Sequence, residues 1–223
     1  MFITPAGTCP DAAGKPCWSH PGCDDGAGDD ERIPAPEVEV TMTAALFGHD
    51  GPWTEEEYLA LGETRQRVEL FDGSLHVTPA PTPRHQRIAR RLGNVLEPAA
   101  EAAGLELLEA VNVRLRPDRI PIPDVVITGP IDLDQVNIDA ADVRLICEIV
   151  SPGNAATDRV LKMHYYAEAR IPWYLLVEQE TGSLHLYREK NGHHVEESTA
   201  APGGLLELTE PVHVAIRPER LLD

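Results

Sequence analysis

The sequence predicts a mixed α/β domain in which helices flank a central mixed sheet and an extra antiparallel hairpin is attached. Val143 to Val150 is a long, nearly continuous apolar run, as expected for a strand that is buried on both faces. Residues 84–103 carry apolar side chains at helical spacing. Asn191-Gly192 separates two alternating segments, which is the pattern of a hairpin. Helix and strand signals therefore occur in one domain, and no internal repeat is visible in the sequence.

Residues 1–41 differ in composition from the rest of the chain. They are rich in Gly, Pro, Asp and Ala and show no sustained hydrophobic periodicity. Such a segment buries too little apolar surface to offset its conformational entropy. We therefore predict a disordered acidic extension over 1–41 and a folded domain over 42–223. Met42 opens that domain and is an alternative start of the chain.

Three cysteines lie close together within this extension. Cys9, Cys17 and Cys23, together with His20, could form a tetrahedral zinc site. Their spacing does not match an established zinc pattern, so incidental cysteines in a loose segment are the favoured interpretation and zinc is the alternative. Cys147 lies far away in an apolar run, and we predict that it is a small buried side chain.

The folded domain begins with a short helix and a hairpin. Thr54 precedes three glutamates, which is typical of an N-cap with acidic residues in the first turn and predicts a helix over 55–61. Residues 67–71 and 74–77 alternate between apolar and polar side chains. Asp72-Gly73 between them supplies a tight turn, so these segments are expected to pair.

A longer helix is predicted over 84–103, after a proline-rich break in the chain. Gly104 follows it as a C-cap. Pro98 conflicts with an uninterrupted helix because proline has no backbone N–H to donate. We therefore expect either a kink at this residue or two shorter helices.

Most of the remaining elements are strands. Residues 109–115 alternate, with Val111, Val113 and Leu115 on one face of a predicted strand. The other predicted elements are strands over 123–127, 143–150 and 173–178, a helix over 155–169, and an antiparallel strand pair over 184–188 and 194–197.

Composition argues against several classes of protein. The chain has 37 acidic and 19 basic residues, a formal net charge of −18, which argues against nucleic-acid binding by bulk charge. No apolar run approaches the roughly 20 residues that a membrane-spanning helix needs. The first residues show neither the basic nor the apolar segment of a secretory signal. We therefore expect a cytoplasmic protein that does not associate with membranes.

Two acidic residues stand in strands that are predicted to be buried. Asp124 begins one short strand, and Glu148 lies near the end of the next long one. A buried carboxylate is costly unless it is paired or binds a metal. Two carboxylates on neighbouring strands can hold a hard divalent cation, and Lys162 in the following helix could stabilise developing charge. The combination indicates metal-assisted hydrolysis of a phosphodiester.

Each of these residues also has an ordinary structural interpretation. Asp124 could cap a turn after two prolines, Glu148 could face water, and Lys162 could pair with Asp158 at helical spacing. Their joint order and their placement in apolar strands favour the metal site. Because two carboxylates repel each other without a cation, we expect Asp124→Asn to leave the metal-free protein equally stable or slightly more stable.

An ordered set of short motifs runs through the domain. It consists of Trp53-Thr54-Glu55-Glu56-Glu57-Tyr58, Val68-Glu69-Leu70-Phe71-Asp72-Gly73, Pro83-Arg84-His85-Gln86, Pro123-Asp124-Val125-Val126, Glu148-Ile149-Val150-Ser151-Pro152, Asp158 with Lys162 and Tyr166, and Ile171-Pro172-Trp173-Tyr174. With this set the chain resembles the PD-(D/E)XK nuclease superfamily, which has the restriction-endonuclease-like fold. More closely, it resembles the bacterial Uma-two family within that superfamily, from about Trp53 to about Arg188.

The resemblance implies a fold, an activity and a metal site. The expected fold is the restriction-endonuclease-like mixed sheet, and the expected activity is that of a Mg²⁺- or Mn²⁺-dependent endonuclease acting on DNA. Asp124, Glu148 and the backbone carbonyl of Ile149 are the metal ligands that the resemblance implies.

The resemblance also implies roles for residues outside the two acidic strands. The usual lysine of the superfamily stands two residues after the second acid, where this chain has Val150. In the Uma-two family the lysine is assigned to the next helix, and Lys162 is the matching position. The resemblance also implies an accessory acid or imidazole, for which Glu69 and His85 are the matching candidates, and a surface or capping role is the alternative for His85.

A different class of function stays open beside the nuclease. The displaced lysine and the acidic charge also suit a catalytically inactive binding or interaction module that keeps the nuclease fold, with a homodimer as one form of it. The densest basic cluster is either a solvated helix face or a phosphate-facing patch, and consists of Arg84, Arg87, Arg90 and Arg91. The aromatic residues expected to fill the core rather than stack on bases are Trp53, Trp173, Tyr165, Tyr166 and Tyr174. His193-His194 is interpreted as part of a turn.

Overall fold

The chain divides into two units, residues 1–43 and 44–223. The computed structural model describes residues 49–64, 66–151 and 157–222, all of which belong to the second unit. The expectations for the N-terminal extension, including the possible zinc site, fall outside these described residues. The side chain of Asp158 is also outside them. Among the described helices, none is both long enough and apolar enough to cross a membrane.

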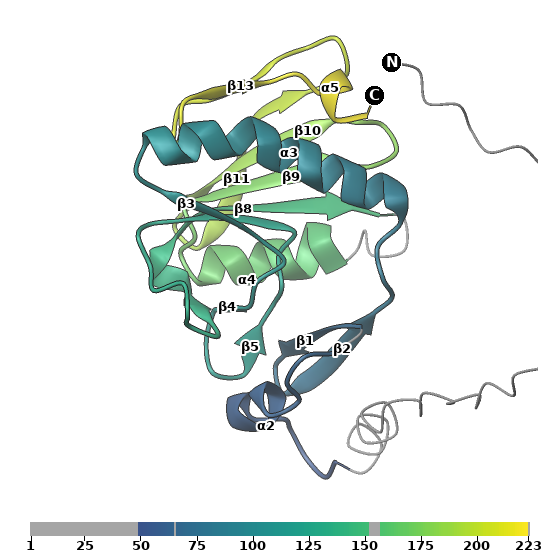
Figure 1. Ribbon diagram of the computed structural model, residues 1–223, viewed down its shortest axis with the longest axis vertical. Coiled ribbons are helices and arrows are strands. Elements are labelled where there is room, and N and C mark those ends of the chain that lie inside the picture. Colours follow the sequence, from purple (N-terminus) through teal and green to yellow (C-terminus); the bar gives the residue numbers. More distant parts are fainter. Residues whose placement is uncertain (1–48, 65, 152–156, 223) are drawn as a thin grey trace, which may run out of the picture. The chain divides into compact units, whose positions relative to one another are not determined.

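A six-stranded mixed sheet organises the second unit, as the sequence predicts (Figure 1). Strands β8 and β9 are parallel, and every other neighbouring pair in this sheet is antiparallel. From one edge to the other, the strands are β11 (His193–Ala200), β10 (Leu184–Lys190), β9 (Trp173–Glu178), β8 (Val143–Val150), β6 (Val125–Thr128) and β3 (Glu106–Glu109).

Each face of this sheet packs against a helix (Figure 1). The two helices are α3 (Pro83–Ala102) and α4 (Met163–Glu168). Along β8, Cys147 and Ile149 belong to the core beneath α3, whereas Ile146 and Val150 belong to the core beneath α4. Burial on both faces explains the continuous apolar run of this strand, and alternation places Glu148 on the α4 side. The prediction for Cys147 is confirmed, since it is fully buried.

The predicted hairpin forms and belongs to a second, smaller sheet. β1 (Arg67–Phe71) pairs with β2 (Ser74–Thr78) and with β5 (Arg119–Ile120). Its turn at Asp72-Gly73 has positive φ angles of 50° and 76°, which is why an aspartate and a glycine stand there. The short helix α2 (Glu55–Leu59) precedes it and begins at Thr54 with a capping box, so the predicted helix start is confirmed.

Helix α3 runs without a break through Pro98. Pro98 cannot donate to the carbonyl of Asn94, but both residues are exposed, so water can bind that carbonyl instead. The helix begins at Thr82, whose hydroxyl accepts from the His85 backbone N–H, and Gly104 follows its end with a φ of 67°. Of the two alternatives expected at Pro98, the division into two helices is therefore wrong, and the expected C-terminal glycine is confirmed.

Two predicted elements differ from the structure. The strand over 109–115 is interrupted at Ala110, whose φ of 53° ends β3, so β4 (Val113–Arg114) pairs instead with β7 (Ile138–Asp139). The helix over 155–169 begins, within the described residues, as a π-helical segment (Thr157–Lys162) that continues into α4. Neither the left-handed alanine nor the wide helical turn has a signal in the hydrophobic pattern.

The last part of the chain closes the core beneath α3. The Asn191-Gly192 turn joins β10 and β11 as predicted, and both strands are longer than predicted. Three short elements after β11 have no counterpart in the sequence prediction, and the 3-10 turn before β8 has none either. They are β12 (Leu206–Leu208), β13 (Val214–Ile216), α5 (Glu219–Leu222) and the turn over Ala140–Asp142.

Candidate active site

A cavity of about 530 Å³ is lined by the residues that the sequence predicts for the site. The hairpin strands, the proline-rich segment before α3, the first turn of α3, and the ends of β6 and β8 all contribute to its lining. The charged and titratable residues of the lining are Arg67, Glu69, His76, His85, Asp124, Glu148 and Lys162. The five side chains predicted to carry catalysis therefore all reach one cavity.

Strand register brings the two acids to the same end of the sheet. Val125 of β6 pairs with Cys147 of β8 in an antiparallel ladder. Asp124 precedes Val125 and Glu148 follows Cys147, so the two acids lie at the same end of this ladder on neighbouring strands. Asp124 is 6% exposed and Glu148 is 1% exposed, so neither faces bulk water. The alternative that Glu148 is a solvated strand-end residue is wrong.

The Asp124 carboxylate is held by three donors. Its Oδ2 accepts a 2.8 Å hydrogen bond from the backbone N–H of Ile149. Its Oδ1 lies 2.7 Å from Nη1 of Arg67 and 3.3 Å from Nε2 of His85. Burial acts to raise the pKa of Asp124, but the hydrogen bond from His85 and the charge of Arg67 outweigh it and hold the pKa well below its ordinary value. Asp124 is therefore ionised at neutral pH.

Lys162 joins the second acid to a third one. Its Nζ lies 3.1 Å from Oε1 of Glu148 and 2.9 Å from Oε1 of Glu69, and all three side chains are at most 4% exposed. Tyr166, one helical turn further, donates to the same Glu148 oxygen at 2.7 Å. Oε1 of Glu69 also accepts from the backbone N–H of Ile122. The lysine thus points at the sheet and not at solvent, as its helical face predicts.

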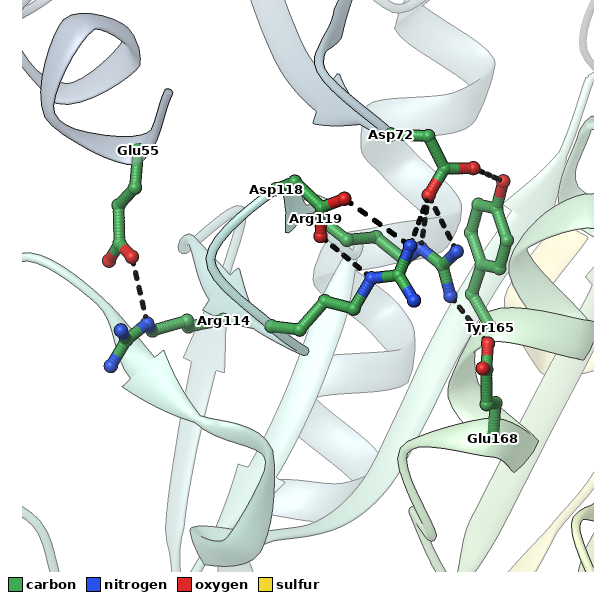
Figure 2. Close-up of polar contacts among 8 residues, drawn as sticks. Glu55, Asp72, Arg114, Asp118, Arg119, Tyr165 and Glu168 are labelled. Atoms are coloured by element: carbon green, nitrogen blue, oxygen red, sulfur yellow. Dashed lines mark hydrogen bonds and ion pairs between the residues drawn. The ribbon is translucent and has the colours of Figure 1, made fainter. Parts of the chain in front are cut away.

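A polar cluster outside the cavity fixes the elements that carry these groups (Figure 2). Arg119 of β5 forms ion pairs with Asp72 in the hairpin turn and with Glu168 near the end of α4, each at 2.6 Å. Its guanidinium lies 3.4 Å from the ring centre of Tyr165, and the Tyr165 hydroxyl donates to Asp72. The cluster ties the hairpin to α4, and these are the two elements that bring Glu69 to Lys162.

The site contains donors that suit a hard divalent cation. Its lining has carboxylate oxygens but no thiol, and oxygen donors are preferred by Mg²⁺ and Mn²⁺. No group of three or more acidic, histidine or cysteine side chains in the described part of the chain is close enough to hold a metal alone. Two carboxylates, one backbone carbonyl and water would therefore have to complete the coordination, which is a usual arrangement for Mg²⁺.

Arg67 is the site residue that sequence reasoning missed. A signal was present, because Arg67 and Glu69 are two residues apart in β1 and must project from the same face of that strand. The expectation of two mutually repelling carboxylates also assumed that neither acid has a cation of the chain beside it. Arg67 on Asp124 and Lys162 on Glu148 supply one cation for each acid.

The other candidates lie outside the cavity. Arg84, Arg87 and Arg90 are exposed on α3, and Arg91 is half-buried, so only His85 of this segment reaches the site. Four of the five aromatic residues are buried as predicted, whereas Trp53 is half-buried and stacks on His49. His194 belongs to β11 and not to a turn, and its ring nitrogens lie 3.2 Å and 3.0 Å from the carbonyl oxygens of Met163 and Ile171.

Comparison with known proteins gives results that agree with this geometry. A model of the Uma2 family, described as "Putative restriction endonuclease", matches residues 55–218. A solved structure entitled as a putative nuclease belonging to DUF820 from Anabaena variabilis ATCC 29413 superimposes with a TM-score of 0.61 at 16% sequence identity. The superposition covers 77% of this chain and 98% of the other, and at this identity it shows a shared fold. No curated protein matches the sequence.

Proposed function

The chain belongs to the Uma2 family of restriction-endonuclease-like proteins, and from this premise we propose that it is a PD-(D/E)XK-type nuclease that hydrolyses phosphodiester bonds of DNA with Mg²⁺ or Mn²⁺. The observation that carries the proposal is the convergence of Asp124, Glu148, Glu69 and Lys162 in one cavity, each at most 6% exposed. Burying three acids and a lysine together costs free energy, and a role in a metal-dependent reaction explains why the chain keeps them there.

The metal would be held by Asp124, Glu148 and the backbone carbonyl of Ile149. The Ile149 N–H already fixes the Asp124 carboxylate against β8, so the two acids are oriented before any ligand arrives. Bound there, the ion would act as a Lewis acid toward a phosphate oxygen.

Lys162 would stabilise negative charge that develops on the phosphate during attack. Its ammonium is fixed by Glu69 and Glu148 in a buried position, where a preorganised charge is most effective. Glu69 is in turn anchored by the backbone N–H of Ile122, so it acts as a positioning residue for the lysine. His85 contacts Asp124 and would orient that carboxylate in the same way.

Cleavage of DNA by the full chain with Mg²⁺ or Mn²⁺ tests the proposal. We expect Lys162→Ala to lower the cleavage rate by about 10² or more without loss of Mn²⁺ affinity. Lys162→Arg should restore little, because a planar guanidinium does not replace a compact ammonium. Lys190→Ala is the matched control, since Lys190 is an exposed lysine on β10 that pairs with Glu197. All variants are assayed well below their unfolding temperatures.

The alternative is a binding module that keeps the nuclease fold without catalysis. It is favoured by the net charge of −18, which repels a polyanion, and by the pairing of each acid with a cation of the chain itself. The same assay separates the two functions. A chain that binds Mn²⁺ but cleaves neither single-stranded nor duplex DNA under any divalent ion would support the binding module, and a Lys162→Ala variant that cleaves normally would contradict the proposed mechanism.

A further inference from the structure

Arg67 is a cation of the site that the proposed reaction does not yet use. Its Nη1 donates to Oδ1 of Asp124 at 2.7 Å. Its Nε and Nη2 atoms are buried and have no hydrogen-bond partner within the described ranges. Burial acts to lower the pKa of the guanidinium, but Asp124, Glu148 and Glu69 outweigh it and raise that pKa, so Arg67 stays charged.

The two unpaired nitrogens indicate which kind of ligand the site can bind. Buried donors without acceptors cost free energy that a matching acceptor recovers. Nε and Nη2 form one edge of the guanidinium, and their parallel N–H bonds match two oxygens of a phosphate or a carboxylate. Among the described residues, a carboxylate pairs with Arg67 only at Nη1. The unpaired edge therefore suits an anion from outside the chain.

The charges of the site identify the kind of anion. Glu69, Asp124 and Glu148 contribute three negative charges, and Arg67 and Lys162 contribute two positive ones. A divalent cation changes this total from one negative to one positive charge. A phosphodiester carries a single negative charge and would make the site neutral, whereas a terminal phosphate would leave it negative again. Burial favours the neutral combination.

We propose that Arg67 binds the scissile phosphodiester by donating from Nε and Nη2 to its non-bridging oxygens. In the metal-free protein the same residue pairs with Asp124. The inference rests on the proposed function and adds a substrate-binding residue to it. The first turn of α3 supports it, because this turn lines the same cavity and contains no acidic residue, so the positive end of the helix dipole is not cancelled.

The proposal predicts opposite effects on two ligands. Arg67 and a divalent ion both need Oδ1 of Asp124, so removal of the guanidinium should strengthen metal binding. The same removal deletes the phosphodiester contact, so it should weaken binding of the substrate. A residue that only supports the fold would weaken both ligands together, and the two readings can therefore be separated.

The experiment uses the full chain with Arg67→Met, Arg67→Lys and the control Arg144→Met. Arg144 is an arginine of β8 that donates to backbone carbonyls at the strand end opposite Glu148. Calorimetry gives the affinity for Mn²⁺. Calorimetry at saturating Mn²⁺ and low temperature then gives the affinity for thymidylyl-thymidine, which has one phosphodiester, and for its uncharged methylphosphonate analogue.

We expect Arg67→Met to bind Mn²⁺ more tightly by roughly tenfold and to bind the dinucleotide more weakly by about tenfold or more. Arg67→Lys keeps the charge beside Asp124 and preserves folding, so it should bind Mn²⁺ like the wild type while still losing dinucleotide affinity. Arg144→Met should change neither, and the methylphosphonate should not discriminate between variants. Unchanged dinucleotide binding by both Arg67 variants, or a parallel loss of both ligands, overturns the inference alone. A wild-type chain that binds no Mn²⁺ overturns the proposed function and the inference with it.

Discussion

The two described lysines allow a direct test of how burial changes the contribution of an ion pair to the free energy of unfolding. Lys162 and its acidic partners Glu69 and Glu148 have side chains that are 4%, 3% and 2% exposed, whereas Lys190 and Glu197 are 50% and 40% exposed. The distances are similar, at 2.9 and 3.1 Å for the buried contacts and 3.2 Å for the exposed one. A difference in stability must therefore come from burial and from the second acidic partner of Lys162, and not from the contact distances.

Replacement of Lys162 by methionine keeps the apolar stem and removes the charge. Two buried carboxylates would then lose a shared cation, and breaking a buried pair in this way costs about 3–5 kcal/mol. For a domain of this size, that corresponds to a fall in the unfolding temperature of roughly 6–20 °C. Lys190→Met should cost only about 0–1 kcal/mol, because an exposed pair contributes little.

Thermal and urea unfolding of the two variants, without metal, measures this difference. The double variant Lys162→Met with Glu69→Gln should recover part of the loss, because only one buried carboxylate then lacks its cation. Equal costs for Lys162→Met and Lys190→Met, within about 1 kcal/mol, would refute the reasoning, since burial would then have no effect on the pair.

Asp124, His194 and Gly73 each allow a further test. Asp124→Asn should abolish Mn²⁺ binding in calorimetry and should also destabilise the metal-free protein by about 3–5 kcal/mol, because Arg67 would lose its partner; a metal-free variant as stable as the wild type would restore the earlier expectation of repelling acids. Burial lowers the pKa of His194, so the neutral ring is favoured in the folded state, and its contribution to stability is complete above about pH 6.5 and is lost as the pH falls; the unfolding temperature should depend less on pH between about 7.5 and 5.5 in His194→Gln, whereas a variant of the exposed His193 should behave like the wild type. Gly73→Ala should lower the free energy of unfolding by roughly 1–3 kcal/mol in a urea titration, because φ is 76° and the added Cβ would lie 2.6 Å from a Pro52 carbon.

The sequence predicts those parts of the site that depend on local pattern. Asp124 and Glu148 could be found because each interrupts an apolar strand, where a carboxylate needs a reason to be buried. Their meeting at one end of the sheet follows from the antiparallel pairing of neighbouring strands. The Lys162 side chain could be placed because helical periodicity fixes the face that it shares with Tyr166.

The remaining parts depend on contacts between distant segments. Arg67 reaches Asp124 from 57 residues away, and Asp72 reaches Tyr165 from 93 residues away. Hydrophobic pattern says nothing about which surface of a hairpin meets which helix. The left-handed Ala110 is hidden for a different reason, because its side chain gives no turn signal and tertiary contacts impose the conformation. The expectation that the two acids repel each other was made without the cations that pair with them, and the Asp124→Asn variant tests it.

The parallel pairing of β8 with β9 has a consequence for the order in which the candidate site forms during folding. Parallel neighbours cannot be joined by a tight turn, so the chain must cross over between them, and Lys162 lies on that crossover. Closing such long connections costs conformational entropy before any stabilising contact forms between the distant segments. Non-local pairing is therefore slow. The hairpin bearing Arg67 and Glu69 must also dock before the cavity is complete. Completion of the cavity, and with it the proposed metal binding, should therefore be the final event of refolding, after the strands of the sheet have assembled.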